Sequence, residues 1–192
     1  MRTTALSNAS RTGTNHAAAT RAAARGKRFA LVASGFHPAL SRALVRGASR
    51  ALSRAGVPSD RIRVLWAPGA FELPVLAAWL ARRRPRPDAI VALGCLIRGE
   101  TAQYEVIAHA VAQGLCQVGV EAAMPVTFGI VVAETLAQAK ARAGLGLRPR
   151  HGLRRPRRGR GGPARPGAIV TNRGEEAAEA ALAMLRLFER TE

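Results

Sequence analysis

The sequence predicts an α/β domain with a four-stranded parallel sheet and helices on both of its faces. Short apolar runs of strand length alternate along the chain with longer segments in which apolar residues recur at helical spacing. Strands that alternate with helices form parallel sheets through right-handed crossovers, and the helices then cover both faces. The 192 residues, of which 48% are hydrophobic, are enough for one domain with a sizeable core, and no apolar run approaches the roughly 20 residues of a membrane span.

The first expected unit is a strand at residues 29–33 followed by a helix at residues 38–55. The strand is a run of apolar residues, and Pro38 suits the first turn of the helix. Apolar residues mark one face of this helix, and arginines recur every four residues on another, at positions 42, 46, 50 and 54. A solvated face is the simplest interpretation of the arginines, and a docking surface for nucleic acid is the minority alternative.

The second unit combines a strand at residues 61–66 with a helix at residues 71–82. The third strand, at residues 89–93, is followed by a glycine-bounded turn that opens the next helix, which ends near residue 119. That turn carries an Arg, a Glu, a Thr and a Gln. In an open α/β sheet, ligands bind at the carboxyl ends of strands and anions bind at helix N-termini, so we expect the functional site at this turn.

A fourth strand at residues 125–132 and a helix at residues 134–142 complete the sheet. Helical periodicity returns at residues 175–188, and the sequence contains no internal repeat. This order of elements predicts a flavodoxin-like domain of three layers, in which helices sandwich the sheet.

The net charge of +18 lies mostly in two segments outside this pattern. Residues 1–28 contain six Lys or Arg and residues 148–165 contain eight Arg, with no acidic residue in either segment. We expect residues 1–26 to form a disordered basic tail. Residues 145–167, rich in Arg, Gly and Pro, would form a disordered insertion in a domain that spans residues 27–190. Both segments would attract polyanions weakly and without sequence preference.

A cytoplasmic location is expected. The acid-free start of the chain also resembles an organelle transit peptide, but an untargeted bacterial extension has the same composition and is the favoured interpretation.

Cys95 and Cys116 lie within apolar segments and not at metal-ligand spacing, which favours buried, reduced thiols over a disulfide or a zinc site. The sequence has no glycine-rich nucleotide-binding motif and no cluster of His and Cys at metal-ligand spacing.

Three loops at the carboxyl ends of the expected strands carry residues beyond ordinary turn formers. Phe36 and His37 follow the first strand, residues 68–72 follow the second, and residues 94–101 follow the third. Taken singly, each loop has a simpler interpretation. The aromatic side chains would fill the core, and the acidic residues would lie in first helical turns, where the helix dipole favours them.

Taken together, these loops and three later segments resemble the lumazine synthase family. The matching segments are Phe36, 68–74 (PGAFELP), 94–101 (GCLIRGET), 125–129 (PVTFG), 138–144 (QAKARAG) and 172–178 (NRGEEAA). They occur in family order over about residues 27–144 and 168–190, so the combined match is specific.

The resemblance implies a transferase that catalyses the penultimate step of riboflavin synthesis. In this reaction 5-amino-6-(D-ribitylamino)uracil condenses with 3,4-dihydroxy-2-butanone 4-phosphate to give 6,7-dimethyl-8-ribityllumazine and phosphate. The family needs no metal ion and no organic cofactor. The family builds its sites between the subunits of a pentamer. The resemblance therefore also implies a homo-oligomer, expected to be a pentamer.

The resemblance assigns roles to individual positions as well. Phe36 would stack on the pyrimidine ring, Ala70, Phe71 and Glu72 would hold its ribityl chain, and Cys95, Leu96 and Ile97 would line the ring pocket. Glu100 and Thr101 at the helix N-terminus would bind the phosphate, together with Arg142 and Arg173. Phe128 would reach the site of a neighbouring subunit. Cations near the phosphate are chemically apt because phosphate is the leaving group and negative charge develops there.

This sequence departs from the family at three places. Gln103 occupies the position of the family's proton-transfer His, and a glutamine cannot exchange a proton near neutral pH. His37, where the family has Asn, is a candidate to replace it. Residues 145–167 separate Arg142 from Arg173 where the family has a short turn, and Arg173 itself stands in place of a Lys.

Two alternatives belong to other functional classes. A catalytically weakened protein that binds the pyrimidine or the lumazine would keep the pocket and lose proton transfer at Gln103. A basic nucleic-acid-binding protein would use the tail and the insertion. The enzyme is the preferred hypothesis, the weakened binding protein the second and the nucleic-acid-binding protein the third; the residue at position 103 discriminates the first two.

Overall fold

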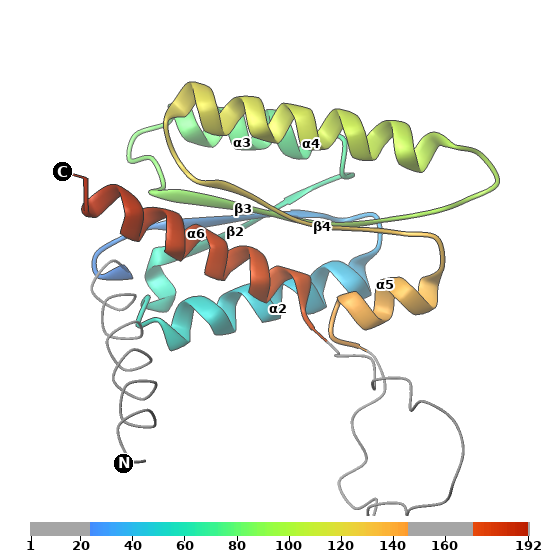
Figure 1. Cartoon of the computed structure of the whole chain (residues 1–192), viewed down its shortest axis with the longest axis horizontal. Coiled ribbons are helices and arrows are strands. Elements are labelled where there is room, and N and C mark those ends of the chain that lie inside the picture. Colours follow the sequence, from blue (N-terminus) through green and yellow to red (C-terminus); the bar gives the residue numbers. More distant parts are fainter. Residues whose placement is uncertain (1–23, 146–170, 192) are drawn as a thin grey trace, which may run out of the picture.

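The computed structural model describes residues 24–145 and 171–191, which form one sheet with helices on both faces (Figure 1). The sheet has four strands, all parallel, in the order β2-β1-β3-β4. The elements are β1 (Phe29–Ser34), α2 (Pro38–Arg54), the short 3-10 helix η1 (Ser59–Arg61), β2 (Ile62–Ala67), α3 (Leu73–Arg82), β3 (Ala89–Ile97), α4 (Gln103–Ala122), β4 (Val126–Ala133), α5 (Leu136–Arg142) and α6 (Arg173–Glu189). The predicted three-layer α/β architecture with a four-stranded parallel sheet is confirmed.

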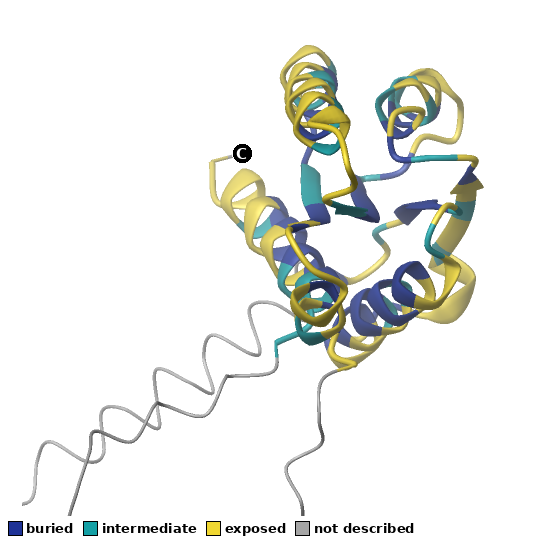
Figure 2. Ribbon diagram, turned by 90° about the vertical axis from the view of Figure 1, so that its right-hand side faces the viewer, coloured by how far each residue is buried: buried dark blue, intermediate teal, exposed yellow. Residues whose placement is uncertain are grey.

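Helices α2, α5 and α6 cover one face of the sheet, and α3 and α4 cover the other (Figure 1). Each face has its own core, because successive strand residues point to opposite sides. Leu31 of β1 packs toward α2 and α6, whereas the next residue, Val32, packs toward α3 and α4. The inner strands are buried along most of their length, while the edge strand β2 exposes Val64 and Trp66 (Figure 2).

Strand β3 extends to Ile97, four residues beyond the predicted end at residue 93. These last residues pair with β4, from Gly94 opposite Ile130 onward. The sequence indicated a turn beginning at Gly94, and that boundary is wrong. Packing and not a turn favours glycine there, because a Cβ at this position would lie 3.2 Å from the Cβ of Ser34 on the neighbouring strand, a tight contact.

Asn172 caps α6 and ties it to two other parts of the fold. Its Oδ1 accepts hydrogen bonds from the N–H groups of Gly174 and Glu175, at 2.9 and 3.2 Å. Its Nδ2 donates to the carbonyl oxygens of Ala43 and Ala143, at 3.0 and 2.8 Å. The cap starts α6 at Arg173, two residues before the predicted start, and brings the two sides of the predicted insertion together.

Most residues of the predicted tail and insertion lie outside the described part of the chain. Within it, Ala24 is fully buried against the core on the α2 and α6 side.

Cys95 is buried as expected, but Cys116 is exposed, so the prediction of a second buried thiol is wrong. Cys116 lies next to Leu115, which α4 buries against the sheet, and the adjacent helical position faces away. In the described ranges, no helix combines the length and the apolar character needed to cross a membrane.

Candidate active site

A cavity of about 780 Å³ opens at the carboxyl edge of the sheet. It lies between the ends of β1 and β3, the loop before α3 and the first turns of α4. The residues lining it are Ser34, Phe36, His37, Gly69, Ala70, Phe71, Glu72, Cys95, Leu96, Ile97, Gly99, Thr101, Gln103, Tyr104 and Ile107. The cavity therefore brings all the predicted pyrimidine-binding residues of this chain's three strand-end loops together with Thr101 and Gln103.

Phe36 lies at the cavity with 74% of its surface exposed. The buried Ser34 at the end of β1 accepts a hydrogen bond of 3.4 Å from the Phe36 N–H. The ring of His37 lies perpendicular to that of Phe36, with the ring centroids 5.0 Å apart. The simpler interpretation of Phe36 as a core residue is therefore wrong, and its ring is accessible to a flat ligand.

The loop before α3 supplies Ala70, Phe71 and Glu72. The carbonyl oxygen of Ala70 accepts a hydrogen bond of 3.2 Å from the Leu73 N–H, which closes the turn and starts the helix two residues later than predicted. Phe71 is 60% exposed, so it too is not part of the core. Glu72 is exposed at the N-cap position of α3, and its side chain makes no capping hydrogen bond. Its carboxylate is thus free to accept hydrogen bonds from ligand hydroxyl groups.

The end of β3 forms an apolar wall of the cavity. Leu96 and Ile97 are half-buried and Cys95 is buried. Burial raises the pKa of the Cys95 thiol from 9.0 to about 11. The thiol is therefore protonated at neutral pH, and because the thiolate is the reactive form, Cys95 serves as a wall and not as a nucleophile.

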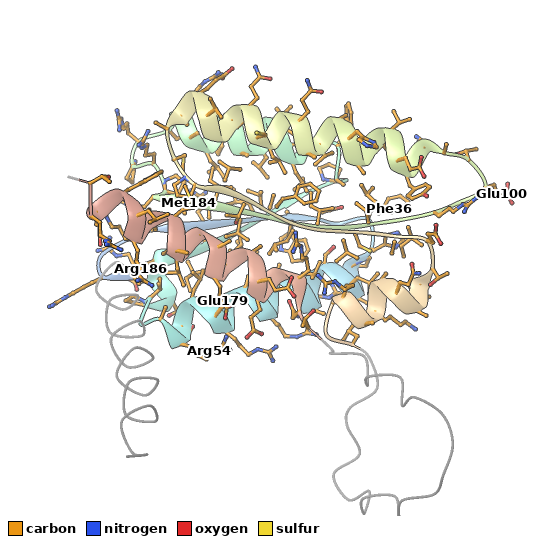
Figure 3. The ribbon with its side chains drawn as sticks, in the orientation of Figure 1. Phe36, Arg54, Glu100, Glu179, Met184 and Arg186 are labelled. Carbon is orange, nitrogen blue, oxygen red and sulfur yellow. The ribbon has the colours of Figure 1, made fainter. Side chains whose placement is uncertain are left out.

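Helix α4 points its N-terminus at the cavity. It begins at Gln103, and the residue before it, Ala102, has no side chain that can cap the first-turn N–H groups. Unpaired N–H groups and the helix dipole favour an anion at such a position. Thr101 lines the cavity there, whereas the exposed Glu100 lies at the tip of the loop between β3 and α4 and does not line it (Figure 3).

The first turns of α4 place Gln103 and Tyr104 at the cavity, where a group that transfers a proton to or from the substrate would lie. The hydroxyl of Tyr104 donates a hydrogen bond of 2.7 Å to Glu105, and this bond raises the pKa of Tyr104 above its ordinary value of 10.0. Gln103 forms hydrogen bonds but does not titrate. Among the described residues that line the cavity, His37 is the one with an imidazole, whose two ring nitrogens can donate and accept hydrogen bonds. No group of His, Cys, Asp and Glu side chains suited to a metal ion occurs within residues 24–145 and 171–191.

Besides Glu100, three of the predicted site residues do not line this cavity. Phe128 is half-buried on β4 opposite Ala92, three residues before Val131, which lies opposite Cys95. At about 3.3 Å per strand residue, Phe128 lies about 10 Å short of the cavity wall along the strand. Arg142 and Arg173 are the other two, and they meet each other elsewhere.

Arg142 ends α5, Arg173 begins α6, and both guanidinium groups bind Glu176. Nη2 of Arg142 and Nη1 of Arg173 each lie 3.1 Å from Oε2 of Glu176, and Nη1 of Arg142 donates to the Thr171 hydroxyl at 2.6 Å. Burial alone would raise the pKa of Glu176. Hydrogen bonds with Thr171 and Arg173 and the charges of both arginines outweigh burial and hold that pKa below its ordinary 4.5.

Three residues that line the cavity lie outside the loops and positions singled out in the sequence: Ser34, Tyr104 and Ile107. Tyr104 and Ile107 lie three positions apart, so they share one face of α4. Helical spacing counted from the start of α4 could have found them. Nothing in the sequence distinguishes Ser34 from other small residues at strand ends.

The chain matches one family of known proteins over most of its length. The profile of the 6,7-dimethyl-8-ribityllumazine synthase family matches residues 26–189. A protein of that name from Gemmatimonas aurantiaca is 41% identical over 165 residues, which cover 86% of this chain and 86% of the relative. One from Aquifex aeolicus is 39% identical over 166 residues (86% and 92%), and one from Chlorobaculum tepidum is 46% identical over 121 residues (63% and 77%). The chain therefore belongs to the 6,7-dimethyl-8-ribityllumazine synthase family.

Proposed function

We propose that this chain is a transferase of riboflavin biosynthesis that condenses 5-amino-6-(D-ribitylamino)uracil with 3,4-dihydroxy-2-butanone 4-phosphate and releases phosphate. The products are 6,7-dimethyl-8-ribityllumazine and phosphate. The observation that carries this proposal is the cavity at the carboxyl edge of the sheet, which gathers the three loops that resemble the family. The family membership of residues 26–189 supports the same reaction.

The pyrimidine substrate would lie in this cavity with its ring against Phe36. The exposed ring of Phe36 supports stacking, which is worth about 1–3 kcal/mol for a flat heterocycle by analogy with nucleic-acid bases. Ala70 and Phe71 would flank the ribityl chain, and the uncapped carboxylate of Glu72 would accept hydrogen bonds from its hydroxyl groups. Cys95 and its two neighbours on β3 would close the ring pocket as an apolar wall.

The phosphate of the second substrate would bind at the N-terminus of α4. Thr101 would offer its hydroxyl there, and the backbone of Glu100 and the first-turn N–H groups would complete the donors. Arg142 and Arg173 would add charge-assisted hydrogen bonds and stabilise negative charge as phosphate departs. No cofactor is required, because the amine and the ketone condense largely by being held together.

Arg142, Arg173 and Phe128 would serve the cavity of a neighbouring copy of the chain. They do not line the cavity of their own chain, and both arginines are partly exposed, with 45% and 39% of their side chains accessible. A head-to-tail contact that closes into a ring joins the cavity of one copy to a different surface of the next. A homopentamer with sites between its subunits has this arrangement.

Proton transfer is the step at which this chain differs from its family. General acid–base catalysis contributes about 10²–10⁴-fold, and Gln103 cannot supply it. His37 lies in the same cavity and has the required chemistry. This observation favours an active enzyme over the alternative of a weakened protein that only binds the pyrimidine or the lumazine.

The basic segments at residues 1–28 and 148–165 would add weak binding of polyanions without replacing the enzymatic role. A cytoplasmic location fits the chemistry of the cysteines, since Cys95 and Cys116 are both unpaired.

The direct test is an assay of the purified full chain with both substrates, read as lumazine formation above the uncatalysed rate. Phe36→Ala should lower kcat/KM by about 5- to 150-fold if stacking is worth the amount given above. Phe188→Ala is the matched control, because Phe188 is also partly exposed but lies near the C-terminal end of α6. A rate equal to the background would reject the proposed function.

A further inference from the structure

Two arginines from different elements converge on one carboxylate oxygen. Arg142 is the last residue of α5 and Arg173 the first residue of α6, and the predicted insertion separates them in the sequence. Both donate to Oε2 of Glu176 from 3.1 Å. Glu176 lies in the first turn of α6, so the carboxylate occupies a fixed point on a regular element.

The hydroxyl of Thr171 closes this contact into a network of four side chains. It accepts the Nη1 hydrogen bond of Arg142 at 2.6 Å and is also hydrogen-bonded to Glu176. A guanidinium group has five N–H donors, so these bonds leave donors on both Arg142 and Arg173. The partial exposure of both side chains leaves those donors accessible to a ligand from outside the chain.

Without the carboxylate, this arrangement would be unfavourable. Two guanidinium groups placed this close repel each other, and each long side chain has many other rotamers. A shared, charged carboxylate offsets the repulsion and restricts both side chains. Glu176 is suited to this because its pKa lies below the ordinary value despite partial burial, so it carries its charge at neutral pH.

We propose that Glu176 is a positioning residue that holds Arg142 and Arg173 as one pair for the phosphate of the four-carbon substrate. This inference rests on the proposed function, in which the two arginines serve that phosphate. Glu176 acts through the arginines and does not itself touch the substrate. Its negative charge also opposes an anion, so the proposal requires that ordering of the pair outweighs this repulsion.

A purely structural role for Glu176 makes different predictions. An acid in a first helical turn stabilises the helix through its dipole. Glu175 is the matched control, because it lies in the same turn but pairs with Arg54 of α2, which also contacts Glu179 (Figure 3). Glu175→Gln therefore removes the dipole interaction and one ion pair without removing the carboxylate shared by Arg142 and Arg173.

The experiment compares the full-length wild type with Glu176→Gln, Glu176→Asp and Glu175→Gln. It measures kcat, KM for each substrate, and the Kd of inorganic phosphate by calorimetry, which needs no turnover. For Glu176→Gln we expect the phosphate Kd and the KM of the phosphate-bearing substrate to rise about tenfold, the order expected for one charge-assisted hydrogen bond, while the KM of the pyrimidine is unchanged. Glu176→Asp should recover part of the loss, and Glu175→Gln should behave as wild type.

Equal effects of Glu175→Gln and Glu176→Gln would overturn the proposal, because they would show a structural role only. Tighter phosphate binding by Glu176→Gln would overturn it as well, since Glu176 would then act as a competitor of the anion. A wild type that forms no lumazine but binds phosphate, with the loss confined to Glu176→Gln, would reject the proposed function and support the positioning role.

Discussion

Ala143 and Asn172 pair as an antiparallel bridge although 29 positions separate them in the chain. The side-chain Nδ2 of Asn172 donates to the carbonyl oxygen of Ala143 at 2.8 Å. The two sides of the predicted insertion therefore meet at one fixed point of the domain, next to Arg142 on one side and Arg173 on the other. The sequence alone left open whether the insertion would keep these two arginines apart, and it does not.

Replacing residues 146–170 with a Gly/Ser linker of about six residues should preserve the fold and the activity, because the bridge closes the domain without them. The shorter loop should stabilise the protein by about 1 kcal/mol through its smaller closure entropy. Denaturant unfolding and the lumazine assay measure the two effects. Loss of activity in a stable variant would show that the segment contributes to the site, and retained salt-dependent RNA binding would exclude it as the polyanion site.

His37→Asn should lower kcat by about 10²–10⁴-fold with little change in the KM of either substrate, because it removes the one proton-transfer group of the right type among the described cavity residues. Steady-state kinetics over pH 5–9 measure this.

Gln103→His in the His37→Asn background is the corresponding rescue. A histidine at position 103 lines the same cavity, so it should restore part of kcat. Unchanged turnover in His37→Asn would reject the role of His37 and leave proximity as the main source of catalysis.

Gly174→Ala should destabilise the protein by about 1–3 kcal/mol, the usual cost of overpacking. A Cβ at Gly174 would lie 2.2 Å from the carbonyl oxygen of Leu44, and backbone atoms cannot move aside as a flexible side chain can. Denaturant unfolding measures the change. Gly99→Ala is the control, because a Cβ there has no neighbour within 4 Å. Equal stability of the two variants would mean that the backbone of α6 at Gly174 does not approach Leu44 of α2 this closely.

Glu176 should make the free energy of unfolding depend on pH in the acidic range. Its folded-state pKa lies below 4.5, so it stabilises the fold above its unfolded-state pKa and loses this contribution as pH falls through the folded-state pKa. The wild type should therefore have a higher Tm than Glu176→Gln at pH 7, by a small margin because the group is partly exposed, and the difference should shrink as pH falls below 4.5 and the carboxylate becomes protonated in the folded state. Thermal unfolding from pH 7 to pH 3 measures it, and a constant difference would contradict the shift.

The sequence predicted the fold well because strand and helix periodicities were regular. It failed where packing between distant segments decides the outcome. Gly94 resembles a turn residue but lies inside β3, where it pairs with Ile130 of β4 and where a Cβ would make a tight contact of 3.2 Å with the Cβ of Ser34. Cys116 lies in an apolar segment, yet it falls on the outward side of α4, where only the helix phase decides exposure.

The candidate site was predictable as three separate loops, since strand ends in a parallel sheet meet at one edge. The cavity that joins them depends on side-chain volumes and could not be derived from spacing. The contact of Arg142 and Arg173 with Glu176 was also beyond the sequence. It requires the Asn172 cap to fix where α6 begins, and no local pattern encodes that long-range pairing.

The division of one site between two copies of the chain is tested most directly by mixing two weakened variants. Phe36→Ala damages the cavity and Arg142→Ala the arginine pair, and each alone should have low activity. Co-expression in equal amounts should restore about a quarter of wild-type activity, because random assembly in a ring pairs an intact cavity with an intact arginine at one interface in four. Activity no higher than the mean of the two variants measured separately would contradict a shared site and place both residues in a single copy.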